Sequence, residues 1–175
     1  MDTTDLTLRY TSTNNTGVDI VGVQFLSYLD ADINGANNPS QEVAAASGSQ
    51  AVGQAFEVGT PEGTCPETLD NLLLGRLSNT NDFRPGTPGN VAMALSWDLE
   101  TLVNGASTPV DVMISEDGAL LGPFSLRQSD ATTDSTTSIT YSGAIRAVPL
   151  PSVIALLLPG FVALRLLGRG RRSEY

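Results

Sequence analysis

The stretch Val91-Ala92-Met93-Ala94-Leu95-Ser96-Trp97 decides the fold class of this chain. Its large residues stand at every second position and alternate with small ones, and successive side chains of an extended strand point to opposite faces. The stretch therefore predicts a half-buried β-strand with its large residues on the core face. We expect Trp97, the only tryptophan, to pack in that core.

Short segments of the same kind flank this stretch on both sides. Further strands are predicted over residues 6–10, 18–29, 110–114 and 138–147. Between them lie clusters of Asn, Gly and Pro, a hairpin-type turn at Glu116-Asp117-Gly118 and a polar loop over 129–138. Residues 67–77 fit a helix or a strand equally well. The spacing predicts an all-β domain, either a single β-sandwich or a jelly-roll.

Composition limits the functions that this domain can have. Residues 1–147 carry 18 acidic side chains against five Arg, a net charge of −13, which argues against nucleic-acid binding. The chain has no His and no Lys, so it lacks the usual triads, His-ligated zinc and a Schiff-base lysine. Cys65 is the only cysteine, so no internal disulfide forms. We therefore expect a protein that is not an enzyme.

The last 28 residues differ from this acidic domain. Val148, Pro149, Leu150 and Pro151 precede an apolar run, and Arg165, Arg169, Arg171 and Arg172 follow it. A helix over residues 153–167 would be about 22 Å long, which is short for the ~30 Å hydrocarbon core of a membrane. We expect a short hydrophobic helix that inserts weakly, with its Arg cluster on the cytoplasmic side. The chain thus divides into a domain over 1–147 and a tail over 148–175.

The tail resembles the PEP-CTERM class of carboxyl-terminal sorting signals, and most closely its VPLPA-CTERM variant. The shared pattern is a short proline motif, one hydrophobic segment and a terminal Arg cluster; Ser152 stands where the variant usually has Ala. The resemblance implies that an exosortase, a membrane-embedded processing enzyme, recognises Val148–Pro151 and removes the tail. It also implies transient insertion in the inner membrane, delivery to the cell surface or beyond it, and an association with exopolysaccharide and biofilm systems.

The amino terminus carries no visible export signal. Residues 1–5 are polar and acidic, whereas a secretory signal starts with basic residues and continues with an apolar segment. We therefore expect that an upstream leader is missing from this chain.

Two patterns in the domain suggest ligand chemistry. Asp30, Asp32 and Asn34, followed by Gly35, have the spacing of oxygen ligands in a Ca²⁺ loop, but the later ligand positions do not match an EF-hand. A shorter Ca²⁺ loop and a polar loop that caps its own backbone are both open interpretations. Asp98 and Glu100 share one side of an extended segment, as a pair of glycosidase carboxylates would.

The sequence supports three hypotheses about function. The first is an exported, exosortase-processed protein of the cell surface or exopolysaccharide matrix with a structural or interaction role. The second is a surface module that binds Ca²⁺ or carbohydrate, with Tyr10, Tyr28, Tyr141 and Trp97 as candidates for sugar stacking. The third is a secreted glycosidase. Apart from Ca²⁺ in the second hypothesis, we expect no cofactor.

Overall fold

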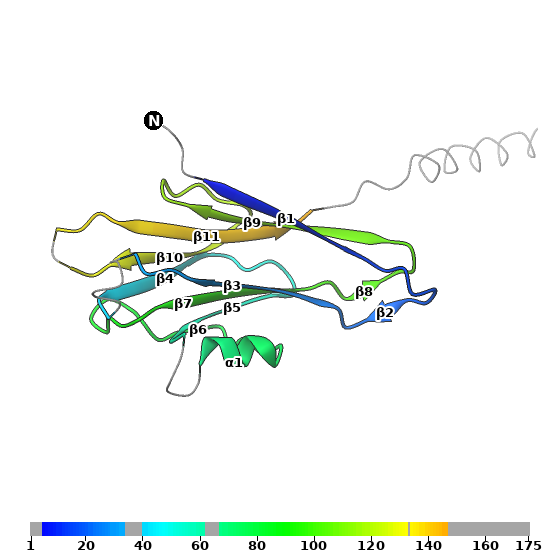
Figure 1. The fold of residues 1–175 in the computed structure, drawn as a ribbon, viewed down its shortest axis with the longest axis horizontal. Coiled ribbons are helices and arrows are strands. Elements are labelled where there is room, and N and C mark those ends of the chain that lie inside the picture. The colour runs from blue at the N-terminus through cyan, green and yellow to red at the C-terminus, as the bar shows by residue number, and fades with distance from the viewer. Residues whose placement is uncertain (1–4, 34–39, 62–66, 133, 147–175) are drawn as a thin grey trace, which may run out of the picture.

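A computed structural model describes residues 5–33, 40–61, 67–132 and 134–146. These residues form eleven β-strands and one short α-helix, which confirms the all-β prediction. The strands build two main sheets that lie one above the other, and the helix covers the outer side of the lower sheet (Figure 1). The predicted tail over 148–175, with its helix, lies outside the described residues.

The larger sheet has five antiparallel strands in the order β1-β9-β11-β10-β4. Their bounds are Leu6–Thr13 for β1, Ser107–Ser115 for β9, Ser138–Ile145 for β11, Phe124–Asp130 for β10 and Glu42–Gly48 for β4. The last described strand, β11, is the middle strand of this sheet, so the sheet is complete only once Ile145 has been reached.

The smaller sheet has four strands in the order β3-β7-β5-β6, and a two-stranded sheet joins β2 to β8. Their bounds are Gln24–Asp30 for β3, Ala92–Asp98 for β7, Gln54–Gly59 for β5, Thr80–Asn81 for β6, Ile20–Val21 for β2 and Thr101–Leu102 for β8. The predicted strand over 18–29 is therefore split into β2 and β3, and Gly22 between them has the positive φ of +68° that glycine adopts without strain.

One hydrophobic core lies between the two main sheets. Trp97, Met93 and Leu95 from β7 meet Val110 and Tyr141 from the opposite sheet, all of them almost fully buried. Burial of these side chains supplies the main stabilisation, roughly 1.5–3 kcal/mol for each large apolar group. The prediction that Trp97 packs in the core is confirmed.

The prediction of a half-buried strand at 91–97 is wrong, because β7 is buried on both faces. The helix α1, Thr68–Leu73, contacts the strand. We assign α1 to the outer side of the sheet, over Ala92, Ala94 and Ser96, because the alternate residues of β7 face the core. Small side chains on that face let the helix come close, so their size reflects packing and not solvent exposure.

The predicted hairpin at Glu116-Asp117-Gly118 is also wrong, although a turn is present there. Gly118 has a φ of +86°, but the strands that the segment connects, β9 and β10, are not neighbours, because β11 lies between them. The connection crosses the outer face of β11, where the backbone N–H of Leu121 donates to Ser142 Oγ at 3.0 Å. A connection of this kind depends on strand order, which local turn chemistry does not reveal.

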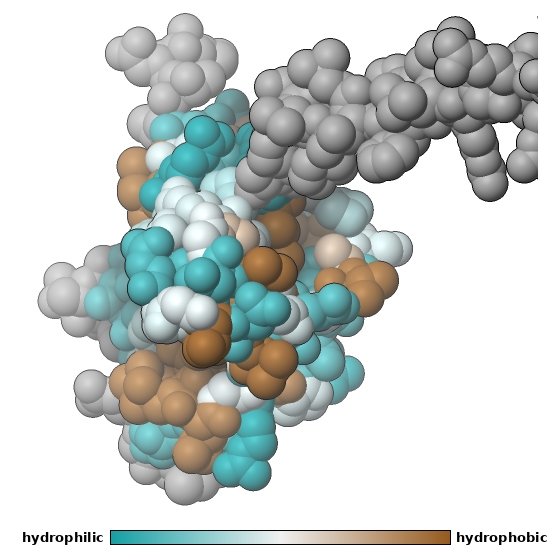
Figure 2. All heavy atoms as spheres, turned by 90° about the vertical axis from the view of Figure 1, so that its right-hand side faces the viewer, coloured by the Kyte–Doolittle hydropathy of each residue, from teal (hydrophilic) through white to brown (hydrophobic). Residues whose placement is uncertain are grey.

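The predicted polar loop over 129–138 is shorter than expected, since β10 extends to Asp130 and β11 begins at Ser138. At the end of the molecule that carries β2 and β8, apolar side chains lie scattered between polar ones (Figure 2). Exposed apolar residues of these elements and their flanks include Ile20, Val21 and Val103.

Candidate functional site

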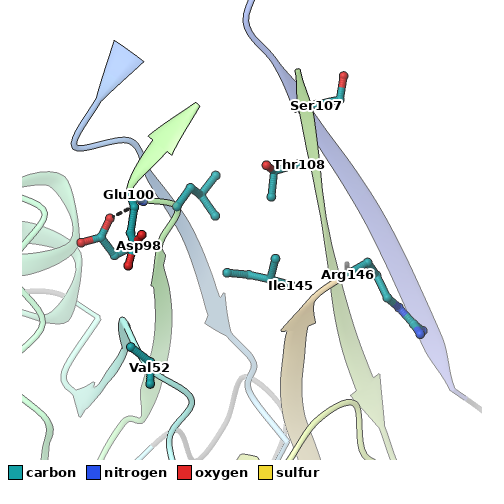
Figure 3. Close-up of a pocket in the computed structure, with 8 residues that line it drawn as sticks. Val52, Asp98, Glu100, Ser107, Thr108, Ile145 and Arg146 are labelled. Atoms are coloured by element: carbon teal, nitrogen blue, oxygen red, sulfur yellow. Dashed lines mark hydrogen bonds between the residues drawn. The ribbon is translucent and has the colours of Figure 1, made fainter. Parts of the chain in front are cut away.

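An open cleft of about 470 Å³ lies where β7 ends and β11 leaves the larger sheet (Figure 3). Its lining residues are Val52, Asp98, Leu99, Glu100, Ser107, Thr108, Ile145 and Arg146. Thr108 and Ile145, from the larger sheet, face the turn that follows β7 across the open space. Both main sheets therefore contribute to the cleft.

One wall of the cleft is acidic and is held in a defined turn. Asp98 ends β7, and its Oδ1 accepts a hydrogen bond from the backbone N–H of Glu100 at 2.7 Å. Glu100 has a φ of +54°, which costs a non-glycine residue about 1–2 kcal/mol. The backbone N–H of Gly22 donates to the Glu100 carbonyl at 2.8 Å and helps to hold this conformation. The two carboxylates that the sequence suggested as a pair thus line the same cleft.

The basic residue on the rim points away from the cleft. The Arg146 side chain runs to the outer face of the larger sheet, where its Nε donates to Asp111 Oδ2 at 2.6 Å. Arg9 approaches the same carboxylate with its Nε at 2.7 Å and its Nη2 at 2.9 Å. The positive charge of Arg146 is therefore paired with Asp111, and the cleft keeps an acidic character.

The Arg9–Asp111–Arg146 network joins three adjacent strands, β1, β9 and β11. Hydrogen bonds from Arg9, together with those from Arg146 and the two positive charges, hold the pKa of the Asp111 carboxyl well below its usual range. Asp111 itself is covered, but the two Arg side chains that cover it are 63% and 53% exposed. The network is therefore a surface feature of the sheet and is partly screened by solvent.

The cleft offers carboxylate acceptors on one side and a hydroxyl group on the other. Carboxylates at Asp98 and Glu100 accept hydrogen bonds or attract a cation, and Thr108 supplies a hydroxyl. The Ser107 hydroxyl points away from the open space and shares a hydrogen bond of 2.8 Å with Thr13 Oγ1. Aliphatic side chains, including Ile145, lie between these groups. The arrangement suits a ligand that carries several hydrogen-bond donors on an apolar frame, and sugars are ligands of this kind.

Of the four aromatic candidates for sugar stacking, Trp97, Tyr141 and Tyr10 do not present a free ring, and Tyr28 is partly buried in β3. Trp97 and Tyr141 are core residues, and the Tyr141 hydroxyl donates to Ser27 or accepts from it. Burial raises the pKa of Tyr141 well above its usual range. Tyr10 is exposed on one side, but its ring packs against Phe25 with centroids 5.1 Å apart.

The predicted Ca²⁺ ligands lie at the opposite end of β7. Asp30 is the last residue of β3 and Asp32 lies in the turn after it, whereas Asn34 is outside the described residues. Gln128 Nε2 fixes this turn by donating to the Ala31 carbonyl at 2.6 Å. Within the described ranges, no three His, Cys, Asp or Glu side chains gather closely enough to hold a metal ion. The Ca²⁺ site stays a prediction.

A buried carboxylate near this turn was not predicted from the sequence. Glu42, at the start of β4, is fully buried and accepts hydrogen bonds from the backbone N–H groups of Ile33 at 3.0 Å and Val91 at 3.1 Å. Burial raises the pKa of Glu42, and the two hydrogen bonds partly offset this effect. The side chain joins the larger sheet to segments flanking β3 and β7. The only signal in the sequence is that Glu42 stands two positions before Ala44, which is buried, and so points to the same face of the strand.

The sorting motif Val148–Pro151 and the Arg cluster lie outside the described residues, so their prediction is unchanged. The helix found in the described ranges is too short to cross a membrane. No protein-family model matches the chain, and no match was found among curated proteins or solved structures.

Proposed function

We propose that this chain is an exported surface or matrix protein that consists of one β-sandwich interaction domain followed by a removable sorting signal. The Val-Pro-Leu-Pro motif, the apolar run and the Arg cluster support the sorting role, through their resemblance to exosortase substrates. The processing enzyme is then the first partner of the protein, and the inner membrane is a transient location.

The observation that carries the proposal is the position of the motif relative to the folded domain. All eleven described strands precede it: β11 ends at Ile145, and the backbone N–H of Arg146 still donates to the Pro109 carbonyl at 2.9 Å. Val148 follows two residues later. Cleavage at the motif would therefore release a domain that keeps its complete core and every described strand pair.

The test is the intact mass, with terminal peptide mapping, of the protein isolated from its native cells. We expect a mature chain that ends near residues 148–152, and we expect that Pro149→Ala with Pro151→Ala abolishes this processing. Pro85→Ala, a matched change in an exposed loop, is expected to leave processing intact. A membrane-bound chain that still ends at Tyr175 in the wild type would make the tail a simple anchor and would overturn the sorting role.

A second function, binding of a hydroxylated ligand such as carbohydrate, is supported by the acidic cleft. For an oligosaccharide that binds the wild type, we expect Asp98→Asn with Glu100→Gln to weaken binding at least tenfold, because both changes remove charged acceptors. Calorimetric titration against a panel of neutral oligosaccharides measures this. Turnover of the sugar that stops in either single variant would instead indicate a glycosidase. The absence of heat with every sugar would remove this second function.

A further inference from the structure

Within the described residues, the edge strand β1 has no neighbour on its outer side, whereas the strand at the other edge of the same sheet is covered. β1 pairs only with β9, over a register that runs without a bulge from Leu6↔Ile114 to Thr13↔Ser107. No other described strand pairs with it. At the opposite edge, β4 is covered, since the Ala44 N–H donates to the Phe83 carbonyl and Asn81 Nδ2 donates to the Ala44 carbonyl at 2.7 Å.

The devices that usually guard an edge strand are missing from β1. Proteins block such edges with bulges, prolines, very short strands or charged side chains. β1 has eight residues, no Pro and a single charge, Arg9. The Arg9 guanidinium is bound to Asp111 across the outer face of the sheet, so it does not shield the free backbone. Among the described residues, the edge of β1 away from β9 therefore has backbone donors and acceptors without partners.

The core-side face of β1 is also incompletely covered. Leu6, Leu8 and Tyr10 lie opposite Ile114, Val112 and Val110 in the register and so share the core face of the sheet. Yet they remain 50%, 37% and 43% exposed. β1 thus carries an apolar strip that has lost only part of its contact with water.

We propose that β1 pairs with β1 of a second copy of this chain, antiparallel and about a two-fold axis, to give a continuous ten-stranded sheet. The sequence of the strand favours a second copy because, in one two-fold register, its apolar residues face apolar residues of the other copy. With the axis at Leu8, Leu8 faces its counterpart and Leu6 faces Tyr10, so all apolar side chains meet on one face.

A register shifted by one residue is disfavoured by charge. An axis at Arg9 would place two guanidinium groups directly opposite each other, whereas the axis at Leu8 places Arg9 opposite Thr7. Pairing through a single strand buries less surface than a typical stable interface, so the dimer forms in a concentration-dependent manner. This self-association does not depend on the sorting signal or on the acidic cleft.

Disulfide trapping tests the register directly in the full-length chain, with Cys65→Ser as background and mild detergent as solvent. In the proposed dimer the two residues at position 8 are neighbours with a Cα separation of about 4.5–5.5 Å, which a disulfide can span. The two residues at position 12 lie roughly 27 Å apart at ~3.4 Å per residue. We expect Leu8→Cys to give, on oxidation, a dimer of twice 18.3 kDa, at least tenfold more than Ser12→Cys gives. Equal trapping in both variants, or none in Leu8→Cys, overturns the proposal.

Sedimentation of the full-length chain supplies an independent measurement. We expect Leu8→Arg to raise the dimer dissociation constant at least tenfold, because it places two charges face to face in the apolar strip. Leu73→Arg, a matched change at a leucine of α1 that is 74% exposed, is expected to leave the constant unchanged. Trp97 fluorescence shows whether each variant is folded. If Leu8→Arg does not fold, the disulfide-trapping result alone tests the proposal. Identical association in both folded variants contradicts the proposal.

Discussion

At the scale of single residues, the packing between the two sheets depends on a glycine, which has no side chain. Gly143 lies in β11 on the core side, beneath the indole of Trp97. A Cβ added at Gly143 would lie 2.8 Å from Trp97 Cη2 and 2.7 Å from the Asp111 carbonyl oxygen. The backbone of Gly143 is not in the left-handed region, so glycine is needed here for space and not for its conformation. The largest core residue is therefore accommodated by the smallest one on the opposite sheet.

We predict that Gly143→Ala lowers the free energy of unfolding by about 2–3 kcal/mol, because backbone and ring must both move to admit the methyl group. Urea denaturation followed by the fluorescence of Trp97 measures the change. Gly105→Ala is the control: Gly105 has a φ of +77° and nothing within 4 Å of an added Cβ, so it should lose only about 1 kcal/mol through backbone strain. Equal losses in the two variants would show that steric contact with Trp97 is unimportant.

Trp97 and Gly143 also show what can be predicted from the sequence for single residues. The alternation around Trp97 places its side chain on the core face, because strand periodicity is a local property. Gly143 has no such signal, since its requirement comes from a ring 46 positions away in the sequence that contacts it only after folding. The same holds for Asp111 and its two Arg partners, whose pairing depends on the order of three strands.

At the scale of elements, the helix α1 depends on a buried carboxylate. A helix of six residues is far too short to be stable on its own in water. Glu57 of β5, which is almost fully buried, accepts hydrogen bonds from Asn71 Nδ2 at 2.8 Å, from the Ser78 N–H at 2.9 Å and from Ser78 Oγ at 2.6 Å. This side chain therefore holds both the helix and the segment after it on the smaller sheet.

We predict that Glu57→Gln loosens α1 without unfolding the sheets. The amide keeps the shape of the carboxylate but replaces one acceptor by a donor that faces other donors, a loss of about 1–3 kcal/mol. Hydrogen exchange of amides in residues 68–79 should become at least tenfold faster, while exchange in β9 stays unchanged. Glu100→Gln, at an exposed glutamate, serves as the control. Unaltered exchange in α1 would mean that apolar contacts alone hold the helix.

Element prediction from the sequence succeeded where the signal was local. The strands around 6–10, 91–97, 110–114 and 138–147 are present with shifted ends, and the helical alternative for 67–77 is the correct one. Strand order could not be predicted, because turn chemistry at Gly118 is the same whether the next strand is a neighbour or passes over β11. Burial of β7 on both faces depends on α1, which lies outside the local pattern.

At the scale of the whole molecule, the excess of negative charge and the strongly stabilised carboxylate of Asp111 respond to acid in opposite ways. Protonation of exposed carboxylates relieves repulsion within a domain of net charge −13. Protonation of Asp111 removes the acceptor shared by Arg9 and Arg146 and so loosens the joint between β1, β9 and β11. Because the pKa of Asp111 is lowered by folding, its contribution to stability is present above the ordinary aspartate value of about 3.9 and is lost as the pH falls below it.

We therefore predict that Asp111→Asn lowers the free energy of unfolding at pH 7 by about 1–2 kcal/mol, a value reduced by the solvent exposure of the two Arg side chains. The difference between wild type and variant should shrink as the pH is lowered from about 4 towards 2, because the wild type loses the same interaction there. Urea titrations at several pH values, followed by Trp97 fluorescence, measure both effects. Asp82→Asn, a matched change at an exposed aspartate, should alter neither. A difference that stays constant across this range would mean that Asp111 stabilises the sheet through packing and not through its charge.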